Sequence, residues 1–209
     1  MIFDKTMLFE SEKERNLYYK FFAGFFLNEL VDGYQSRTQA LRLLLNRRLL
    51  ESGSTFKLEN FDGTLLASFD YHSYLLENSS DKGELADILI EDLANRSVIA
   101  IEAKFLTDWN FDKDITANAE RIKILRDKFQ INVIQALLLT RRKHTAVMQA
   151  ANHPDSNYHR LLGYSRESKQ PFIVLEWEEL IGLVDKSKYA AVADYFTDLV
   201  GRNREDFRR

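Results

Sequence analysis

The fold of this chain is decided by two stretches, Leu85-Ala-Asp-Ile-Leu-Ile-Glu-Asp92 and Ser97-Val-Ile-Ala-Ile-Glu-Ala-Lys104. Both are short runs rich in isoleucine, leucine and valine, a composition typical of buried β-strands. A brief segment that contains asparagine, Ala94-Asn-Arg-Ser97, joins them and has the character of a turn. Together they predict an antiparallel β-hairpin in the middle of the chain.

The hydrophobic pattern predicts which residues of the hairpin share a face. A turn centred between residues 95 and 96 would put Leu89 opposite Glu102 and Asp87 opposite Lys104. Directly opposed residues lie on the same face of a sheet, and a shift of one residue would move the charges onto the apolar face. The sequence therefore predicts that the two acids and the lysine share one face. The other face would carry Ile88, Ile90, Ile99 and Ile101.

The segments around the hairpin predict an alternation of helices and strands. Helical spacing of apolar residues predicts helices over residues 11–32, 38–51, 114–129, 177–184 and 187–200. Short apolar runs predict further strands over residues 64–71, 131–140 and 172–175. Residues 141–170 show little pattern beyond a short helix at 145–151. This order predicts a mixed α/β sheet in one domain, residues 1–209, with a core over about 11–140 and a strand–helix extension over about 141–209.

Composition excludes several classes of protein. The 209 residues include no cysteine, which excludes disulfides, thiolate metal sites and a cysteine nucleophile. The net charge of −3 argues against a protein that coats nucleic acid, but not against an enzyme with a local basic surface. No apolar run approaches the roughly 20 residues of a membrane helix, and the first residues do not resemble a signal peptide. We therefore expect a soluble, cytoplasmic protein without a membrane partner.

The acids and the lysine of the hairpin suggest metal-dependent chemistry on phosphates. Mg²⁺ prefers a few carboxylate oxygens together with waters and substrate phosphate oxygens. Asp87 and Glu102 would supply the carboxylates, and the main-chain carbonyl of Ala103 would add a ligand. Lys104 would position or deprotonate a water, or stabilise charge on the phosphate. Burial lowers and neighbouring acids raise the pKa of a lysine, so its protonation state stays open.

This arrangement resembles the PD-(D/E)XK nuclease superfamily, which has the restriction-endonuclease-like fold. In that family an Asp near the second core strand precedes a (D/E)-x-K motif on the third, and Asp87, Glu102 and Lys104 match these positions. Ala86 stands where the motif name has proline. The resemblance covers about residues 64–140. It implies an αβββαβ core with a mixed central sheet, extra N-terminal and C-terminal helices, and a requirement for Mg²⁺, with Mn²⁺ as a substitute.

The resemblance also implies auxiliary residues. Many members carry a further acid on the first core helix, for which Glu29 is the candidate and Glu14 the alternative. Glu84 would place another carboxylate near the entrance of the second strand. Gln135 is a candidate for hydrogen bonding near the site, although the interpretation as a satisfied core glutamine is favoured. The chain has no clear Gln-x-x-x-Tyr motif, which does not support the RecB-like or iron–sulfur branches.

The region from residue 120 to 144 is the most basic part of the chain. It suggests contacts to a phosphate backbone, with a solvated helix face as the alternative for its helical residues. The candidates are Arg121, Lys128, Arg141, Arg142 and Lys143, and the last three are favoured because they follow a buried strand. The four histidines, His72, His144, His153 and His159, show no zinc-binding spacing.

The function predicted from these residues is a metal-dependent phosphodiesterase, an endo- or exonuclease. We expect DNA as the substrate, with RNA as the alternative, and a role in restriction, defence or repair as a homodimer or within a larger assembly. The competing interpretation is a catalytically silent nuclease-fold module that binds nucleic acid or a protein partner. The simplest alternative is an exposed hairpin on which Glu102 and Lys104 form a surface ion pair.

Overall fold

The structure is a computed structural model that describes most of the chain from residue 34 to residue 183. The described residues are 34–60, 63, 65–69, 86–104, 119–150, 153–154, 156–168, 170–183, 190, 194 and 197–198. The helix predicted over residues 11–32 and most of that over 187–200 lie outside them. No helix within the described residues is long and apolar enough to cross a lipid bilayer.

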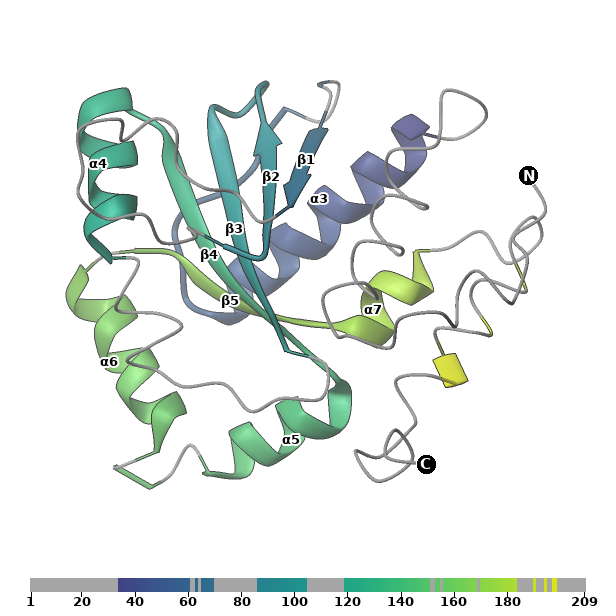
Figure 1. Ribbon diagram of the computed structural model, residues 1–209, viewed down its shortest axis with the longest axis vertical. Helices are drawn as coiled ribbons and strands as arrows, with labels where there is room; N and C mark the ends of the chain where they lie inside the picture. The colour runs from purple at the N-terminus through teal and green to yellow at the C-terminus, as the bar shows by residue number, and fades with distance from the viewer. Residues whose placement is uncertain are drawn as a thin grey trace.

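The centre of the fold is an open sheet of five strands that follow one another in chain order (Figure 1). The strands are β1 (Leu65–Phe69), β2 (Ile88–Asp92), β3 (Ser97–Lys104), β4 (Asn132–Leu139) and β5 (Phe172–Glu176). Strands β1, β2 and β3 pair antiparallel, whereas β3, β4 and β5 pair parallel. The sheet is therefore mixed, and β3 is its central strand.

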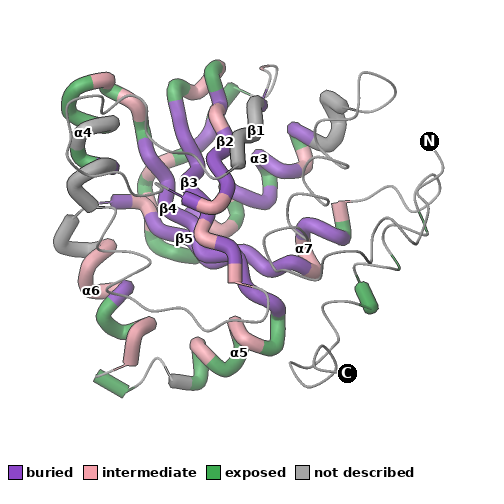
Figure 2. Tube along the Cα trace, in the orientation of Figure 1, coloured by how far each residue is buried: buried purple, intermediate pink, exposed green. Residues whose placement is uncertain are grey.

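Helices cover both faces of the sheet (Figure 1). They are α3 (Tyr34–Glu51), α4 (Ala119–Phe129), α5 (Arg141–Ala150), α6 (Asn157–Ser168) and α7 (Trp177–Gly182). Leucines of α3 and α7 pack in one cluster with the isoleucines of the hairpin. On the other face, Ile122 of α4 packs against β2, β3 and β4, and Leu161 of α6 packs against β4 and β5. The buried residues of Figure 2 accordingly follow the strands and the inner sides of the helices.

The α/β class and the predicted order of helix, three strands, helix and strand agree with the structure. The differences lie in residues 141–170, where the sequence predicted only a short helix at 145–151. The structure has two helices there, α5 and α6, each with one side against the sheet. Their apolar residues are few because both helices pack on a single small cluster, so the helical pattern in the sequence is weak.

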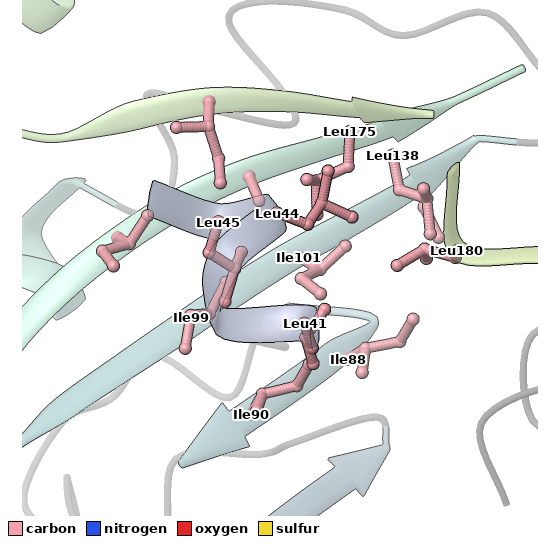
Figure 3. Close-up of a cluster of buried hydrophobic side chains, with 14 of the residues drawn as sticks. Leu41, Leu44, Leu45, Ile88, Ile90, Ile99, Ile101, Leu138, Leu175 and Leu180 are labelled. Atoms are coloured by element: carbon pink, nitrogen blue, oxygen red, sulfur yellow. The ribbon is translucent and has the colours of Figure 1, made fainter. Parts of the chain in front are cut away.

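The predicted isoleucine face is confirmed. The isoleucines of β2 and β3 are all buried in the cluster beneath α3, as Figure 3 shows. Leu41, Leu44 and Leu45 of α3 lie directly over them. Burial of a side chain of this size stabilises a fold by about 1.5–3 kcal/mol, so this face provides much of the driving force for folding.

The predicted register of the hairpin is wrong by two residues. The structure pairs Ile88 with Ile101 and Leu89 with Ala100, and the turn consists of residues 93–96. A shift of two residues leaves every side chain on its predicted face, because strand side chains alternate with a period of two. The acids and the lysine therefore stay opposite the isoleucine face.

Polar contacts explain why β2 ends at Asp92. Its carboxylate is fully buried and accepts hydrogen bonds from Arg42 of α3, at 2.8 Å from Nε and 3.1 Å from Nη2. The side-chain amide of Asn95, in the turn, donates to the same carboxylate at 3.0 Å. These contacts place Asp92 at the last paired position and leave Leu93 in the turn.

Removal of the buried carboxylate should therefore destabilise the whole fold. We expect Asp92→Ala to lower the free energy of unfolding by about 3–5 kcal/mol, because it removes one partner of a fully buried ion pair. Urea denaturation followed by circular dichroism measures the change. The matched control is Asp127→Ala, which removes an exposed ion pair with Arg126 and should cost about 1 kcal/mol or less. Equal effects of the two substitutions would contradict this role of Asp92.

Candidate active site

Glu102 and Lys104 lie together at the C-terminal end of the central strand. They are two residues apart on β3 and so project from the same face, and Lys104 Nζ lies 2.6 Å from Glu102 Oε1. Their side chains are only 18% and 15% exposed. The ion pair expected in the simplest alternative is therefore present, but it lies on the central strand and is partly buried, so the hairpin is not exposed as that alternative expected.

Asp87 immediately precedes β2 and reaches across to the same end of β3. Its Oδ2 accepts a hydrogen bond from the main-chain N–H of Ala103 at 2.8 Å. The ladder ends with the pair of Ile88 and Ile101, and the next position along both strands puts Asp87 opposite Glu102. Because the N–H of Ala103 points toward β2, Glu102 occupies a non-hydrogen-bonded position, where opposed Cα atoms are only about 4.5 Å apart. The observed register thus brings the acids closer than the predicted one.

The main-chain carbonyl of Ala103 lies on the same side as Asp87. The N–H and C=O of a strand residue point to the same neighbouring strand, and the N–H of Ala103 points to Asp87. Ladder pairing with β2 ends at Ile101, so this carbonyl lies beyond the last paired position on that side. Two carboxylates and a carbonyl form a donor set made only of oxygen, which suits a hard cation such as Mg²⁺.

This donor set has fewer protein ligands than a site in which the protein alone surrounds the metal ion. Within the described residues, no group of three or more acids and histidines converges. This fits Mg²⁺, which proteins usually hold through one or two carboxylates while waters and substrate phosphates complete the octahedron. The auxiliary candidates Glu14, Glu29 and Glu84 lie outside the described residues.

Gln135 lies on the same face of the sheet, one strand away from the pair. It is the β4 partner of Ala100, and it is only 4% exposed. Its side-chain oxygen Oε1 has no hydrogen-bond partner within the described structure. No described protein residue therefore supplies the donor that the favoured interpretation of a satisfied core glutamine requires for this oxygen.

The structure brings some of the predicted basic residues to this end of the sheet and separates others from it. Arg141, Arg142 and Lys143 form the first turn of α5, directly after β4, whose Leu139 pairs with Lys104. Lys128 lies instead at the end of α4, where its Nζ is 5.5 Å from the ring centre of Phe129, near the first residues of β4. Lys128 is therefore separated from the site by about the length of β3, roughly 23 Å. The side chain of Arg121 is outside the described part of the structure.

Glu176 was missed in the sequence, and so was its contact with His144. Lys104, Leu139 and Glu176 are aligned across the three parallel strands, so Glu176 lies on the face of Lys104, two strands or about 10 Å away. Glu176 Oε1 lies 2.8 Å from Nδ1 of His144, and Oε2 accepts a hydrogen bond from Arg141 Nε at 2.8 Å. An acid directly after the buried run of β5 was the available signal in the sequence.

The environment of Glu176 favours its ionised form. Burial alone would raise the pKa of this carboxyl, but the hydrogen bonds from Arg141 and His144 and their charges outweigh burial. The pKa of Glu176 is therefore below its usual value. The carboxylate thus orients Arg141 and His144 at the end of β5.

The sequence matches no protein-family model, and comparisons with curated proteins and with solved structures gave no match either. The functional interpretation of this end of the sheet therefore depends on its geometry and chemistry.

The lowered pKa of Glu176 predicts how stability depends on pH. The wild type should be more stable than Glu176→Gln at pH 7, by up to about 1 kcal/mol, since Arg141 is solvent-exposed. A carboxyl with a lowered folded-state pKa contributes stability above its unfolded-state pKa of about 4.3 and loses it as pH falls through the folded-state value. Urea denaturation between pH 7 and pH 2 should show the two proteins converging. Glu59→Gln, at an exposed position, is the control, and a constant difference down to pH 2 would contradict the prediction.

Proposed function

We propose that this protein is a Mg²⁺-dependent nuclease that hydrolyses phosphodiester bonds in DNA. The observation that carries the proposal is the convergence of three groups at one end of β3. The Asp87 carboxylate binds the main chain of Ala103, beside the largely buried pair of Glu102 and Lys104. A partly buried pair of charges is a poor source of stability, so its presence on a central strand favours a chemical role.

The order of the elements supports the proposal. The series α3, β1, β2, β3, α4, β4, with β3 and β4 parallel, has the same order as the core of the PD-(D/E)XK nucleases. On this alignment Asp87 precedes the second strand, and Glu102 and Lys104 end the third. Residues 141–183 would then be an addition to that core. Fold alone does not establish an activity, so the side chains carry the proposal.

Each group has a distinct role in the proposed reaction. Asp87, Glu102 and the carbonyl of Ala103 would hold Mg²⁺, and when bound the metal would polarise the phosphate and lower the pKa of a water. The ammonium group of Lys104 is held 2.6 Å from Glu102, from where it can donate a hydrogen bond to a phosphate oxygen on which charge develops. Asp87 additionally fixes the end of β3 through the N–H of Ala103.

A second function is favoured by the same ion pair. The contact between Glu102 and Lys104 satisfies both charges without a metal, as in a nuclease-fold module that has lost its activity and only binds nucleic acid or a protein partner. In such a module the pair would stay closed in the presence of Mg²⁺. RNA as substrate, cleavage inside or at the ends of a strand, assembly as a homodimer or in a larger complex, and roles in restriction, defence or repair remain predictions.

Lys104→Ala should abolish cleavage without unfolding the protein. We expect the rate on plasmid DNA to fall by about 10²–10⁴-fold, the range for loss of a residue that stabilises the transition state or transfers a proton. Gel assays on plasmid DNA, single-stranded DNA and RNA, each with Mg²⁺, Mn²⁺ or chelator, measure the rate and identify the substrate. Lys123→Ala, on the exposed side of α4, is the matched control and should cleave like the wild type.

Three outcomes would count against this assignment. Equal cleavage by Lys104→Ala and the wild type would place the activity elsewhere. Activity that persists in chelator would exclude the metal. A wild type that binds DNA but neither cleaves any substrate nor binds Mg²⁺ by calorimetry would favour the binding module.

The first turn of α5 should contact the phosphate backbone. We expect Arg142→Ala and Lys143→Ala each to reduce the slope of log affinity against log salt by about 0.9 for duplex DNA, as each lost phosphate contact releases one counterion fewer. Fluorescence anisotropy at several salt concentrations, in a Lys104→Ala background, measures the slope without cleavage. Lys128→Ala is the control because Lys128 lies at the opposite end of the sheet. If all three variants kept the slope of the Lys104→Ala background, the DNA would be bound elsewhere.

A further inference from the structure

Among the residues that the structure describes, the apolar packing on the face of the candidate site forms two clusters. One contains Val133 and Ala100 beneath α4, and the other contains Leu137 and Phe172 beneath α5 and α6. On the opposite face, beneath α3 and α7, a single cluster extends across β1 to β5. The division is therefore a feature of one face and not of the sheet as a whole.

Polar residues occupy the boundary between these clusters. Gln135 lies on β4 between Val133 and Leu137, with Ala100 of one cluster and Phe172 of the other as its neighbours across the sheet. Glu102 lies two residues beyond Ala100 on β3, also between the clusters. Gln135, Glu102 and Lys104 thus form a line of polar residues. It leads from the C-terminal end of β3 into the interior of the sheet face.

A buried acceptor without a partner is unusual in this position. An unsatisfied buried polar group costs about 1–3 kcal/mol, and an apolar residue of the same shape would avoid that cost. Gln170, the other buried glutamine of the described region, shows the ordinary case, because its Nε2 donates to the carbonyl of Val133. Gln135 Oε1 therefore requires a donor that the described protein residues do not supply.

We propose that Gln135 is a positioning residue that orients Glu102 through a bridging water, an inference that rests on the proposed function. Adjacent strands lie about 4.8 Å apart and two residues along a strand span about 6.6 Å, so the two Cα atoms are about 8 Å apart, which a glutamine, a water and a glutamate together span. The water donates one hydrogen to Gln135 Oε1 and the other to the carboxylate of Glu102. Its role is to hold this carboxylate in the orientation that binds Mg²⁺, as hydrogen bonds behind metal ligands generally do.

The test compares two equally buried glutamines. Gln135→Leu and Gln135→Met remove the acceptor and keep the volume, and we expect little change in melting temperature, because only a contact to water is lost. Calorimetry should show Mg²⁺ affinity about 10–100-fold weaker, the usual effect of losing a group that supports a metal ligand. Gln170→Leu is the matched control. It should lower the melting temperature, because a real hydrogen bond is lost, and leave Mg²⁺ affinity within about twofold.

The possible outcomes distinguish a failure of this inference from a failure of the proposed nuclease function. Wild-type affinity for Mg²⁺ in both Gln135 variants would overturn the positioning role alone, with the nuclease proposal intact. A fall in melting temperature equal to that of Gln170→Leu, without loss of affinity, would show that Gln135 is structural. If the wild-type protein itself binds no Mg²⁺ and cleaves nothing, the proposed function fails and this inference fails with it.

Discussion

The buried ion pair between Arg42 and Asp92 is the constraint on which the rest of the structure depends. Both side chains are fully buried, and such a pair is tolerated only where its hydrogen-bonding groups are satisfied. Asn95 completes the bonding of Asp92, and Arg42 also donates to the carbonyl of Gly63 at 2.6 Å. A Cβ at Gly63 would lie 2.2 Å from that of Ala94, so only glycine fits there. The pair thus joins α3, the end of β2 and the segment before β1 at one point.

This point fixes the register of the hairpin, and the register creates the candidate site at the other end. Asp87 and Asp92 are five residues apart, about 16 Å along a strand. A slip of one residue would send Asp87 to the isoleucine face, and a slip of two would leave it diagonal to Glu102. The polar contacts at the turn therefore decide which carboxylates meet where metal chemistry is proposed. The ion pair of Arg42 with Asp92 and the ion pair of the candidate site are in this way coupled through a single strand.

The faces of the hairpin could be predicted from the sequence, but its register could not. Isoleucines at alternate positions define a face, and that pattern is unchanged by a shift of two residues. The register depends on the contact of Arg42 with Asp92, which are 50 positions apart, and no local pattern reveals such a contact. The same reason explains why the contact between Glu176 and His144, 32 positions apart, was missed. Gln135 was placed correctly on a buried strand, but whether its amide is satisfied depends on neighbours from three strands.

The unequal lengths of β2 and β3 explain why the site lies where it does. β3 has eight residues and β2 has five, so the last residues of β3 extend beyond their antiparallel partner while they remain paired with β4. On the side that β2 no longer covers, main-chain groups of β3 need other partners. Asp87 satisfies the N–H of Ala103, and the carbonyl of the same residue is directed to the same side. An oxygen-rich edge therefore arises within a buried sheet, where the continuous apolar cluster on the opposite face supplies the stability that a polar edge does not.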